Sequence, residues 1–164
     1  MSSHSASFDG AKFRQVLGHF ATGVTVITAV NDDAPVGLAV GSFASLSLEP
    51  PLVLFCPGNQ SASWPKIRAS GSFCANILGA DQEHVCRVFA SKETDKFASI
   101  GWTRTAVTGS PRIDDVLAWI DCTIEEVLPG GDHEIVIGRV RDLDARDAHG
   151  PLVFFRGGYG RFEV

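Results

Sequence analysis

The stretch AWIDCTIEEVLPGGDHEIVIGRV, residues 118–140, contains two alternating segments on either side of a group of turn residues. Apolar and polar side chains alternate from Ala118 to Val127 and again from Glu134 to Val140, which is typical of strands with one buried face. Residues 128–132 separate the two segments, and five residues of this composition commonly join the strands of a hairpin. The pattern therefore predicts a long β-hairpin within an antiparallel sheet.

Strand signals continue on both sides of this hairpin. Val24–Val30 is rich in β-branched residues, and a turn at residues 31–33 leads into a second apolar segment, Pro35–Val40. Val and Ile together number 25 against 11 Leu, which favours a sheet over helices. Six or seven strands at this spacing predict a small closed barrel. The remaining predicted strands are Leu52–Cys56, Phe73–Leu78 and Leu152–Phe155.

Helices are predicted beside the barrel, plugging or flanking it. The apolar side chains between Phe13 and Phe20 recur at i, i+3, i+4 and i+7, and Gly23 sits where such a helix would stop. A short helix from Ser63 to Arg68 and another from Asp81 to Ala90 are also predicted. The polar and turn-rich stretch 91–115 is interpreted as an active-site or interface loop.

Length and composition place the chain among single-domain globular proteins. Its 164 residues are 45% apolar and 20% charged, which excludes global disorder. Residues 1–10 are Ser-rich and are expected to form a flexible N-terminal tail without the features of a secretory signal, so the domain is expected to span residues 11–164. No apolar run approaches the length of a membrane-spanning helix.

The charge and the cysteines exclude further classes. The net charge is −5 without a cluster of Lys and Arg, so duplex nucleic acid is not an expected partner. The cysteines lie singly in apolar segments and form no CxxC pair, so we expect no metal site. They are interpreted as small core residues of a cytoplasmic protein. The phosphate-loop, dinucleotide-binding, serine hydrolase and zinc protease motifs are absent from the sequence.

The segment GLAVGSFASLSLEPP, residues 37–51, is unusual because small residues alternate with hydroxyl side chains directly after a strand. Small side chains let a flat ring approach the backbone, where N–H groups and serine hydroxyls can bond its polar edge. A Ser- and Gly-rich surface connection explains the same composition equally well. Both interpretations remain open on composition alone.

Other segments suggest the remaining parts of a ligand site. Ser61 and Ser63 lie at a predicted helix N-terminus with Lys66 nearby, where an anion such as phosphate could bind, although ordinary capping explains the serines too. Lys92 and Lys96 could contact the same phosphate or could simply be solvated. His133 lies at the hairpin tip, either to stack on an aromatic ligand or as an incidental turn residue. Tyr159, the single tyrosine, lies between glycines, where its ring could cover the mouth of a pocket.

Six segments in this order resemble the short-chain flavin reductase family, the reductase components of two-component flavin-dependent monooxygenases. The resemblance covers the chain from about Phe13 to Phe162. The matching segments are FRQVLGHFATGVTVITA (13–29), GLAVGSFASLSLEPPLVLFC (37–56), SAS (61–63), FASKETDKF (89–97), GGDHEIVIGRV (130–140) and PLVFFRGGYGRF (151–162).

This resemblance implies a mainly β fold, the six-stranded FMN-binding split barrel with flanking helices. It implies a homodimer whose flavin sites lie at the subunit interface. It also implies that NADH or NADPH reduces FMN or FAD, with FMN favoured slightly, and that the reduced flavin passes to a separate oxygenase. Hydride transfer of this kind needs no protein acid or nucleophile, because the cofactors carry the chemistry.

The resemblance also assigns site residues by position. The ring would be bordered by Ala39, Val40, Gly41, Ser42, Ser45 and Leu46. The ribityl chain would run toward the phosphate along Cys56, Pro57, Asn59, Ser61 and Ser63, and the phosphate end would be completed by Ala90 and Lys96. His133 matches a histidine implicated in nicotinamide binding and is the expected catalytic residue, with Tyr159 near the same pocket.

Two departures leave alternatives open. The family usually carries Thr and Asn at the positions of Ala39 and Gly41, so this chain either binds flavin loosely through backbone groups or takes a changed ligand. A flavin-binding module without nicotinamide-driven turnover is one alternative function. A relative that reduces a corrinoid or a ferric complex through bound flavin is another.

Overall fold

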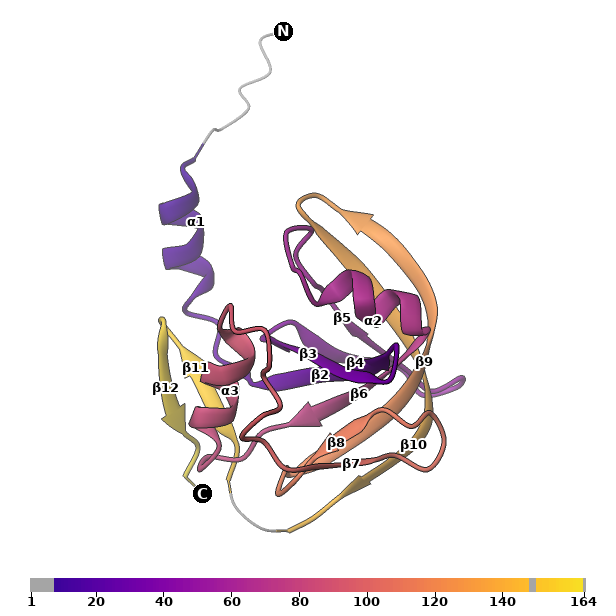
Figure 1. Ribbon diagram of the computed structural model, residues 1–164. Coiled ribbons are helices and arrows are strands. Elements are labelled where there is room, and N and C mark those ends of the chain that lie inside the picture. The colour runs from indigo at the N-terminus through magenta and orange to yellow at the C-terminus, as the bar shows by residue number, and fades with distance from the viewer. Residues whose placement is uncertain (1–7, 148–149, 164) are drawn as a thin grey trace, which may run out of the picture.

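A computed structural model describes residues 8–147 and 150–163 of the chain. Within them the protein is mainly β-structure with short helices at its periphery (Figure 1). The helices are α1 (Gly10–Leu17), α2 (Trp64–Ser70) and α3 (Glu83–Ala90). The strands are β1 (Thr22–Gly23), β2 (Thr25–Asn31), β3 (Ala34–Val40), β4 (Phe43–Ser47), β5 (Leu52–Phe55), β6 (Ser72–Ile77), β7 (Trp102–Arg104), β8 (Pro111–Ile113), β9 (Ala118–Gly130), β10 (His133–Ala145), β11 (Leu152–Phe155) and β12 (Gly158–Arg161).

Seven strands form the main sheet in the order β3-β2-β6-β9-β10-β5-β4, with antiparallel neighbours throughout. Only Gly41 and Ser42 connect the two edge strands, β3 and β4, yet in the described residues these edges are not hydrogen-bonded to each other. The expectation of a closed barrel is therefore wrong. The split-barrel expectation is confirmed, with seven strands in the sheet instead of six, because the chain leaves β3 to pair β4 with β5.

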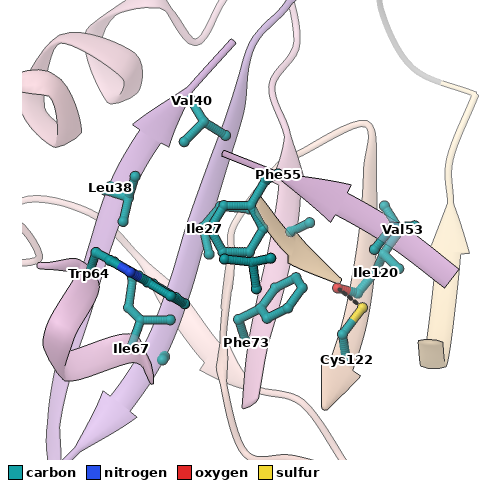
Figure 2. Close-up of a cluster of buried hydrophobic side chains, with 13 residues drawn as sticks. Ile27, Leu38, Val40, Val53, Phe55, Trp64, Ile67, Phe73, Ile120 and Cys122 are labelled. Carbon is teal, nitrogen blue, oxygen red and sulfur yellow. Dashed lines mark hydrogen bonds between the residues drawn. The ribbon is translucent and has the colours of Figure 1, made fainter. Parts of the chain in front are cut away.

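A cluster of aromatic and aliphatic side chains fills the inside of the curved sheet (Figure 2). Phe55 lies edge-on to Phe73 with ring centroids 4.9 Å apart, and Trp64 lies edge-on to Phe55 at 5.7 Å. Trp64 and Ile67 are the buried residues of α2, so this helix closes the interior as a plug. The hydrophobic effect of burying these large side chains stabilises the barrel.

A second cluster joins α3 to the outside of the sheet. Val85, Cys86 and Phe89 of α3 pack with residues of β2, β8 and β11. A Cβ atom on Gly37 of β3 would lie 2.7 Å from Cε1 of Phe89. The missing side chain at Gly37 therefore lets the Phe89 ring lie on the strand, and this contact packs the end of α3 against β3.

Buried polar groups fix the segment around β7 and β8 to the sheet. Asp121 is fully buried, and one of its carboxylate oxygens accepts a hydrogen bond of 3.0 Å from the backbone N–H of Thr108. The Asn76 side chain accepts one of 2.8 Å from the N–H of Ile113. The polar stretch 91–115, expected as a loop, thus contains the small two-stranded β7–β8 sheet and is partly buried.

Three of the four cysteines are buried, as expected for core residues. Burial in the sheet raises the pKa of Cys74, and it raises the pKa of Cys122 to about 12. Both thiols are therefore held in the unreactive protonated form. No group of His, Cys, Asp and Glu within the described residues is arranged to hold a metal ion.

Element boundaries differ from the sequence predictions at several ends. The long hairpin is confirmed, but pairing continues to Gly130 and restarts at His133, which leaves Gly131 and Asp132 as the turn. The first helix ends at Leu17 instead of reaching Phe20. Strands β4 and β12 form in segments for which no strand was predicted. Among the described residues no helix has the length and apolar character needed to span a bilayer.

Helix α1 stands away from the rest of the molecule (Figure 1). None of its residues is buried, and its apolar side chains Phe13, Val16 and Leu17 are each at least half exposed. Phe20, just beyond the helix, is 76% exposed. Phe13 stacks on Phe8, with ring centroids 6.1 Å apart, but the amphipathic stripe that the sequence shows is otherwise largely exposed to solvent.

Candidate functional site

The gap between β3 and β4 leaves backbone groups of the sheet edge without a strand partner in the described residues. Such an edge presents N–H and C=O groups that can bond a ligand. A cavity of about 750 Å³ lies along this edge. Its walls come from the end of β3, the β5–α2 connection, the end of α3 with the loop that follows, and the first residue of β10.

Most of the residues that the sequence analysis assigned to the site line this one cavity. They come from four segments that are separate in the sequence, and the fold brings them together. They are Ala39, Val40, Gly41, Ser42, Cys56, Pro57, Ser61, Ser63, Ala90, Lys96 and His133.

Ser42 ties the β3–β4 connection to the end of β5. Its hydroxyl donates a hydrogen bond to the carbonyl of Cys56 and accepts one from the N–H of Cys56, each 3.1 Å long. The serine is thus engaged in holding the cavity wall. A ligand at this position can therefore bond to the backbone groups of the β3–β4 connection, because the Ser42 hydroxyl is already engaged.

Ser61 and Ser63, which precede α2, differ in their hydrogen bonds. The hydroxyl of Ser61 accepts a hydrogen bond of 3.2 Å from the N–H of Trp64 and so caps the start of the helix. Ser63 occupies the N-cap position but makes no side-chain capping bond. The Ser63 hydroxyl is therefore available to the cavity that it lines.

Lysines line the part of the cavity next to the end of α3. The Lys96 ammonium donates a hydrogen bond of 3.0 Å to the carbonyl of Phe89, in the last turn of the helix. Partial burial lowers the pKa of Lys96, because desolvation penalises its charged form. Lys92 lines the same cavity, and Glu93 is the carboxylate beside them. The local balance of charge favours an anion.

His133 lies at the other wall, beside the β5–α2 connection. Its Nδ1 is 2.7 Å from a carboxylate oxygen of Asp132. The imidazole lowers the pKa of Asp132, chiefly through this hydrogen bond. A Cβ atom on Gly58 would lie 3.7 Å from the His133 Nε2, so the ring lies against the glycine backbone. The side chain remains half exposed to solvent.

Asn59 does not line the cavity, although the sequence analysis assigned it there. Its side-chain amide donates a hydrogen bond of 3.3 Å to the carbonyl of Gly131, and its backbone N–H donates one of 2.9 Å to the carbonyl of Asp132. The backbone N–H of Glu134 donates to the carbonyl of Pro57 as well. These bonds join the β5–α2 connection to the turn before His133.

Three other assigned residues lie outside the cavity of this chain. Ser45 and Leu46 are on β4, the opposite edge of the gap, and both are exposed. Tyr159 packs on α3, where its hydroxyl lies 3.3 Å from the Cys86 sulfur and the Arg87 guanidinium lies over its ring. The hydrogen bond to Cys86 and burial raise the pKa of Tyr159 to about 12.

The structure also brings in residues that the sequence analysis did not assign. Phe89 lines the cavity beside Ala90, although its helical spacing indicated only a core position. The hydroxyl of Thr22 is buried without a hydrogen-bond partner in residues 8–147 and 150–163, and a Cβ atom on Gly41 would lie 3.3 Å from it. No local pattern marks Thr22, because it approaches Gly41 only through the pairing of β2 with β3, in which Thr25 lies opposite Val40.

The arrangement fits a flat ring with an anionic tail. The cavity is lined by the small residues Ala39, Gly41 and Gly58. Their size allows a planar group to reach the unpaired edge of β3. Ser63 and the two lysines can hold a phosphate. Among the described residues that line the cavity there is no pair of carboxylates and no nucleophile with an adjacent base, so the site suits binding and orientation more than acid–base or covalent catalysis.

Comparison with known proteins places this site in context. Residues 17–163 match the flavin reductase like domain. The chain is 55% identical, over 97% of its length and 86% of the relative, to the reductase subunit HsaB of a flavin-dependent monooxygenase from Mycobacterium tuberculosis.

Two solved structures have similar folds. Nitrilotriacetate monooxygenase component B from Mycobacterium thermoresistibile superposes with a TM-score of 0.90 at 53% identity, covering 93% of this chain and 86% of that one. The NADH:FAD oxidoreductase of Streptomyces globisporus C-1027, in complex with NAD and FAD fragments, gives a TM-score of 0.90 at 36% identity, covering 94% and 93%.

Proposed function

The chain belongs to the flavin reductase family, and we propose that the cavity along β3 is the place where it reduces its flavin. As in its relatives, the activity is reduction of a flavin by a nicotinamide nucleotide, with the reduced flavin supplied to a separate monooxygenase component. One observation carries the assignment of the site. A single cavity joins an unpaired strand edge, two lysines and His133.

The flavin ring is proposed to lie on the end of β3. Bound flavin supplies the hydride acceptor and the nicotinamide nucleotide supplies the donor, so the protein contributes binding and orientation. Backbone groups of residues 39–42 hold the polar edge of the ring, because Ala39 and Gly41 have no side-chain donors of their own. Such binding is weaker than binding through the Thr and Asn side chains usual at these positions. Weak binding suits a protein that releases its product.

The phosphate next to the ribityl chain is proposed to lie between Ser63 and the lysines. Lys96 is held in place by its bond to the Phe89 carbonyl, so less entropy is lost when it meets the phosphate. This part of the site is common to FMN and FAD, since both carry a phosphate at the end of the ribityl chain.

His133 is proposed to orient the nicotinamide over the ring. A carboxylate can only accept hydrogen bonds, so the contact with Asp132 places a proton on Nδ1. In the neutral imidazole the Nε2 atom is then an acceptor, and it can take a hydrogen bond from a carboxamide N–H. This contact does not distinguish NADH from NADPH, because the nicotinamide carboxamide is the same in both.

A homodimer is proposed, with α1 as part of its interface. An isolated helix of eight residues is not stable in water, and α1 has no buried residue in this chain. Its exposed apolar side chains therefore require a cover, and a second copy of the chain is the occupant that family membership favours. Ser45 and Leu46, which lie outside the cavity of their own chain, would be available to the partner's site.

Titration and turnover with free flavin test the proposal. We expect FMN or FAD fluorescence to change on binding, and we expect NADH consumption to require added flavin. Lys96→Ala and Ser63→Ala should weaken flavin binding together. Binding without NADH consumption would instead indicate a flavin-binding module. Turnover that is unaffected by both substitutions would overturn the assignment of this cavity.

A further inference from the structure

The hydroxyl of Thr22 is a buried polar group that the fold leaves unbonded. Its oxygen is shielded from solvent and has no hydrogen-bond partner in residues 8–147 and 150–163, and no other buried side-chain nitrogen or oxygen in these ranges shares that state. An unbonded hydroxyl in a protein interior costs free energy, because it has lost its bonds to water. Such a group calls for an explanation, and a role at a functional site is one.

Thr22 lies beside the place where the sheet opens. Its backbone pairs with Phe154 of β11, which holds the main chain at this point. Three residues later, Thr25 lies opposite Val40 at the end of β3, so Thr22 is next to the connection between β3 and β4. Because its backbone is held, Thr22 can change position chiefly through its side chain.

The residue in front of this hydroxyl is Gly41, which lines the proposed flavin cavity. A Cβ atom on Gly41 would lie 3.3 Å from the Thr22 oxygen, and apart from the chain neighbours of Gly41 no other atom lies within 4 Å of that position. Gly41 thus places no side chain between the hydroxyl and the cavity.

Rotation of the Thr22 side chain can bring the hydroxyl to the cavity. The residue as a whole is only partly buried, although its hydroxyl oxygen is shielded. Staggered rotamers of threonine place its hydroxyl and methyl groups in different directions from the same backbone. A change of rotamer can therefore turn the hydroxyl outward while the strand stays in place.

The wall beside Thr22 has few other side-chain donors to offer a ligand. Residues 38–41 carry none, and the Ser42 hydroxyl already donates to the Cys56 carbonyl over 3.1 Å. The polar edge of a flavin ring carries carbonyl oxygens and nitrogens that accept hydrogen bonds. The Thr22 hydroxyl is a donor without another bond, at the wall where this edge is proposed to lie.

We propose that Thr22 is a flavin-binding residue, whose hydroxyl donates a hydrogen bond to the polar edge of the flavin ring beside Gly41. The inference rests on the proposed function and adds one side-chain contact to the backbone contacts of residues 39–42. The protein without flavin carries the cost of the unbonded hydroxyl, and flavin binding removes this cost. The contact involves the ring alone, so it serves FMN and FAD equally.

Thr22→Val tests the proposal, because valine has nearly the same shape as threonine but no hydroxyl. We expect the dissociation constants of FMN and FAD, measured by fluorescence titration, to rise together by about five- to tenfold, the effect of one lost hydrogen bond. The melting temperature of the flavin-free protein, measured by calorimetry, should rise by about 2–4 °C, since valine removes an unbonded polar group from the interior. Thr22→Ser keeps the hydroxyl and should bind flavin as the wild type does.

Thr28→Val is the matched control on strand β2. The Thr28 hydroxyl is fully buried and donates a hydrogen bond of 3.2 Å to the carbonyl of Cys74. Its removal leaves that bond unmade, so the same substitution should lower the melting temperature here and leave flavin affinity unchanged.

The outcomes separate this inference from the proposed function. Unchanged flavin affinity in Thr22→Val would overturn the inference, and so would a lower melting temperature together with weaker binding, since Thr22 would then be a structural residue. A Thr22→Ser protein that binds flavin as weakly as Thr22→Val would overturn it too. If Lys96→Ala still weakens flavin binding in any of these cases, the proposed function stands without the Thr22 contact.

Discussion

His133 owes its proposed role to one short contact and one glycine. The Asp132 carboxylate fixes which ring nitrogen carries the proton, and Gly58 lets the imidazole reach the cavity. We predict that His133→Ala raises the KM for NADH by about three- to tenfold, because one lost hydrogen bond costs about 0.5–1.5 kcal/mol. Steady-state kinetics at saturating flavin measures this effect. The exposed His84→Ala is the control, and an unchanged KM in His133→Ala would remove the residue from the site.

Asn59 is predicted to act on the turn that carries His133. Asn59→Ala removes the donor to the Gly131 carbonyl, and Asn59→Asp places a carboxylate against the same oxygen. We expect both to raise the KM for NADH by a few fold, with Asp the more severe, since losing a hydrogen bond costs about 1 kcal/mol. Flavin affinity, measured by fluorescence titration, should change less. A larger loss of flavin affinity than of NADH affinity would instead support the direct flavin contact expected from the sequence.

Tyr159 can be titrated without interference because it is the single tyrosine. Its hydrogen bond to Cys86 and its burial favour the neutral phenol, so tyrosinate absorbance should appear with a midpoint near 12 instead of the usual 10. Because the folded protein keeps this proton at pH values where the unfolded chain has lost it, the interaction should lose its stabilising effect as the pH rises from 10 to 12. Cys86→Ala should move the midpoint toward 10, and the same midpoint in both proteins would contradict this account.

Residues differ in how well their position in the structure could be predicted from the sequence. Composition alone left the small and hydroxyl residues around Ala39 and Ser63 open between a ligand site and a surface connection, and only the family resemblance assigned them to the site whose cavity they line. The positions of Asn59 and Tyr159 depend on which distant backbone each side chain meets. Asn59 bonds a turn 72 residues away, and a spacing rule cannot show such a contact.

Among the elements, the contact between β3 and α3 is predicted to be sensitive to a single methyl group. Gly37→Ala would place a Cβ atom 2.7 Å from the Phe89 ring, and overpacking of this kind costs about 1–3 kcal/mol. We expect the melting temperature to fall by about 2–4 °C for each kcal/mol lost.

A double-mutant cycle checks the cause. Phe89→Leu alone should destabilise the protein, but combined with Gly37→Ala it should cost less than the sum, because the smaller side chain leaves room for the methyl group. Additive effects would show that the Phe89 ring can move away from the strand. Flavin affinity should fall in Gly37→Ala, because Ala90, Lys92 and Lys96 of the proposed site follow Phe89 in the chain.

The elements with strong periodicity were predictable, and those whose pairing depends on distant strands were not. Alternation alone predicted β9 and β10, although β10 continues beyond the predicted end at Val140 to Ala145. Strand β4 was missed because its small and hydroxyl residues resemble a loop, and only its pairing with β5 makes it a strand. The segment with β7 and β8 looks polar in sequence, yet the buried Asp121 and Asn76 side chains accept hydrogen bonds from its backbone.

At the scale of the whole molecule, α1 is predicted to hold two copies together. Phe13→Glu combined with Leu17→Glu should convert the dimer to a monomer, because charges cannot be buried in an apolar interface without a large desolvation penalty. Analytical ultracentrifugation measures the mass. Lys12→Glu changes the charge of the same helix without touching its apolar side chains and should remain dimeric. A wild-type protein that sediments as a monomer would contradict the proposed assembly.

Closure of the sheet could not be read from the sequence alone. Strand count and turn spacing predict a barrel, but whether its last two edges meet depends on the connection Gly41–Ser42 and on the bonds from Ser42 to Cys56. The family resemblance predicted a split barrel, whereas the periodicity of the strands predicted a closed one. The proposed site lies at that split, so the feature that local patterns missed is the one on which the proposed function depends.

The open edge of the sheet between β3 and β4 also affects what happens to the flavin after its reduction. From the proposed site the reduced ring can leave through the gap between β3 and β4, so its departure depends on affinity and diffusion. Once in water it meets dissolved oxygen before it meets a receiving enzyme. A monooxygenase component in molar excess over this protein would therefore prevent more of the wasteful oxidation of reduced flavin by oxygen than tighter flavin binding by this protein would.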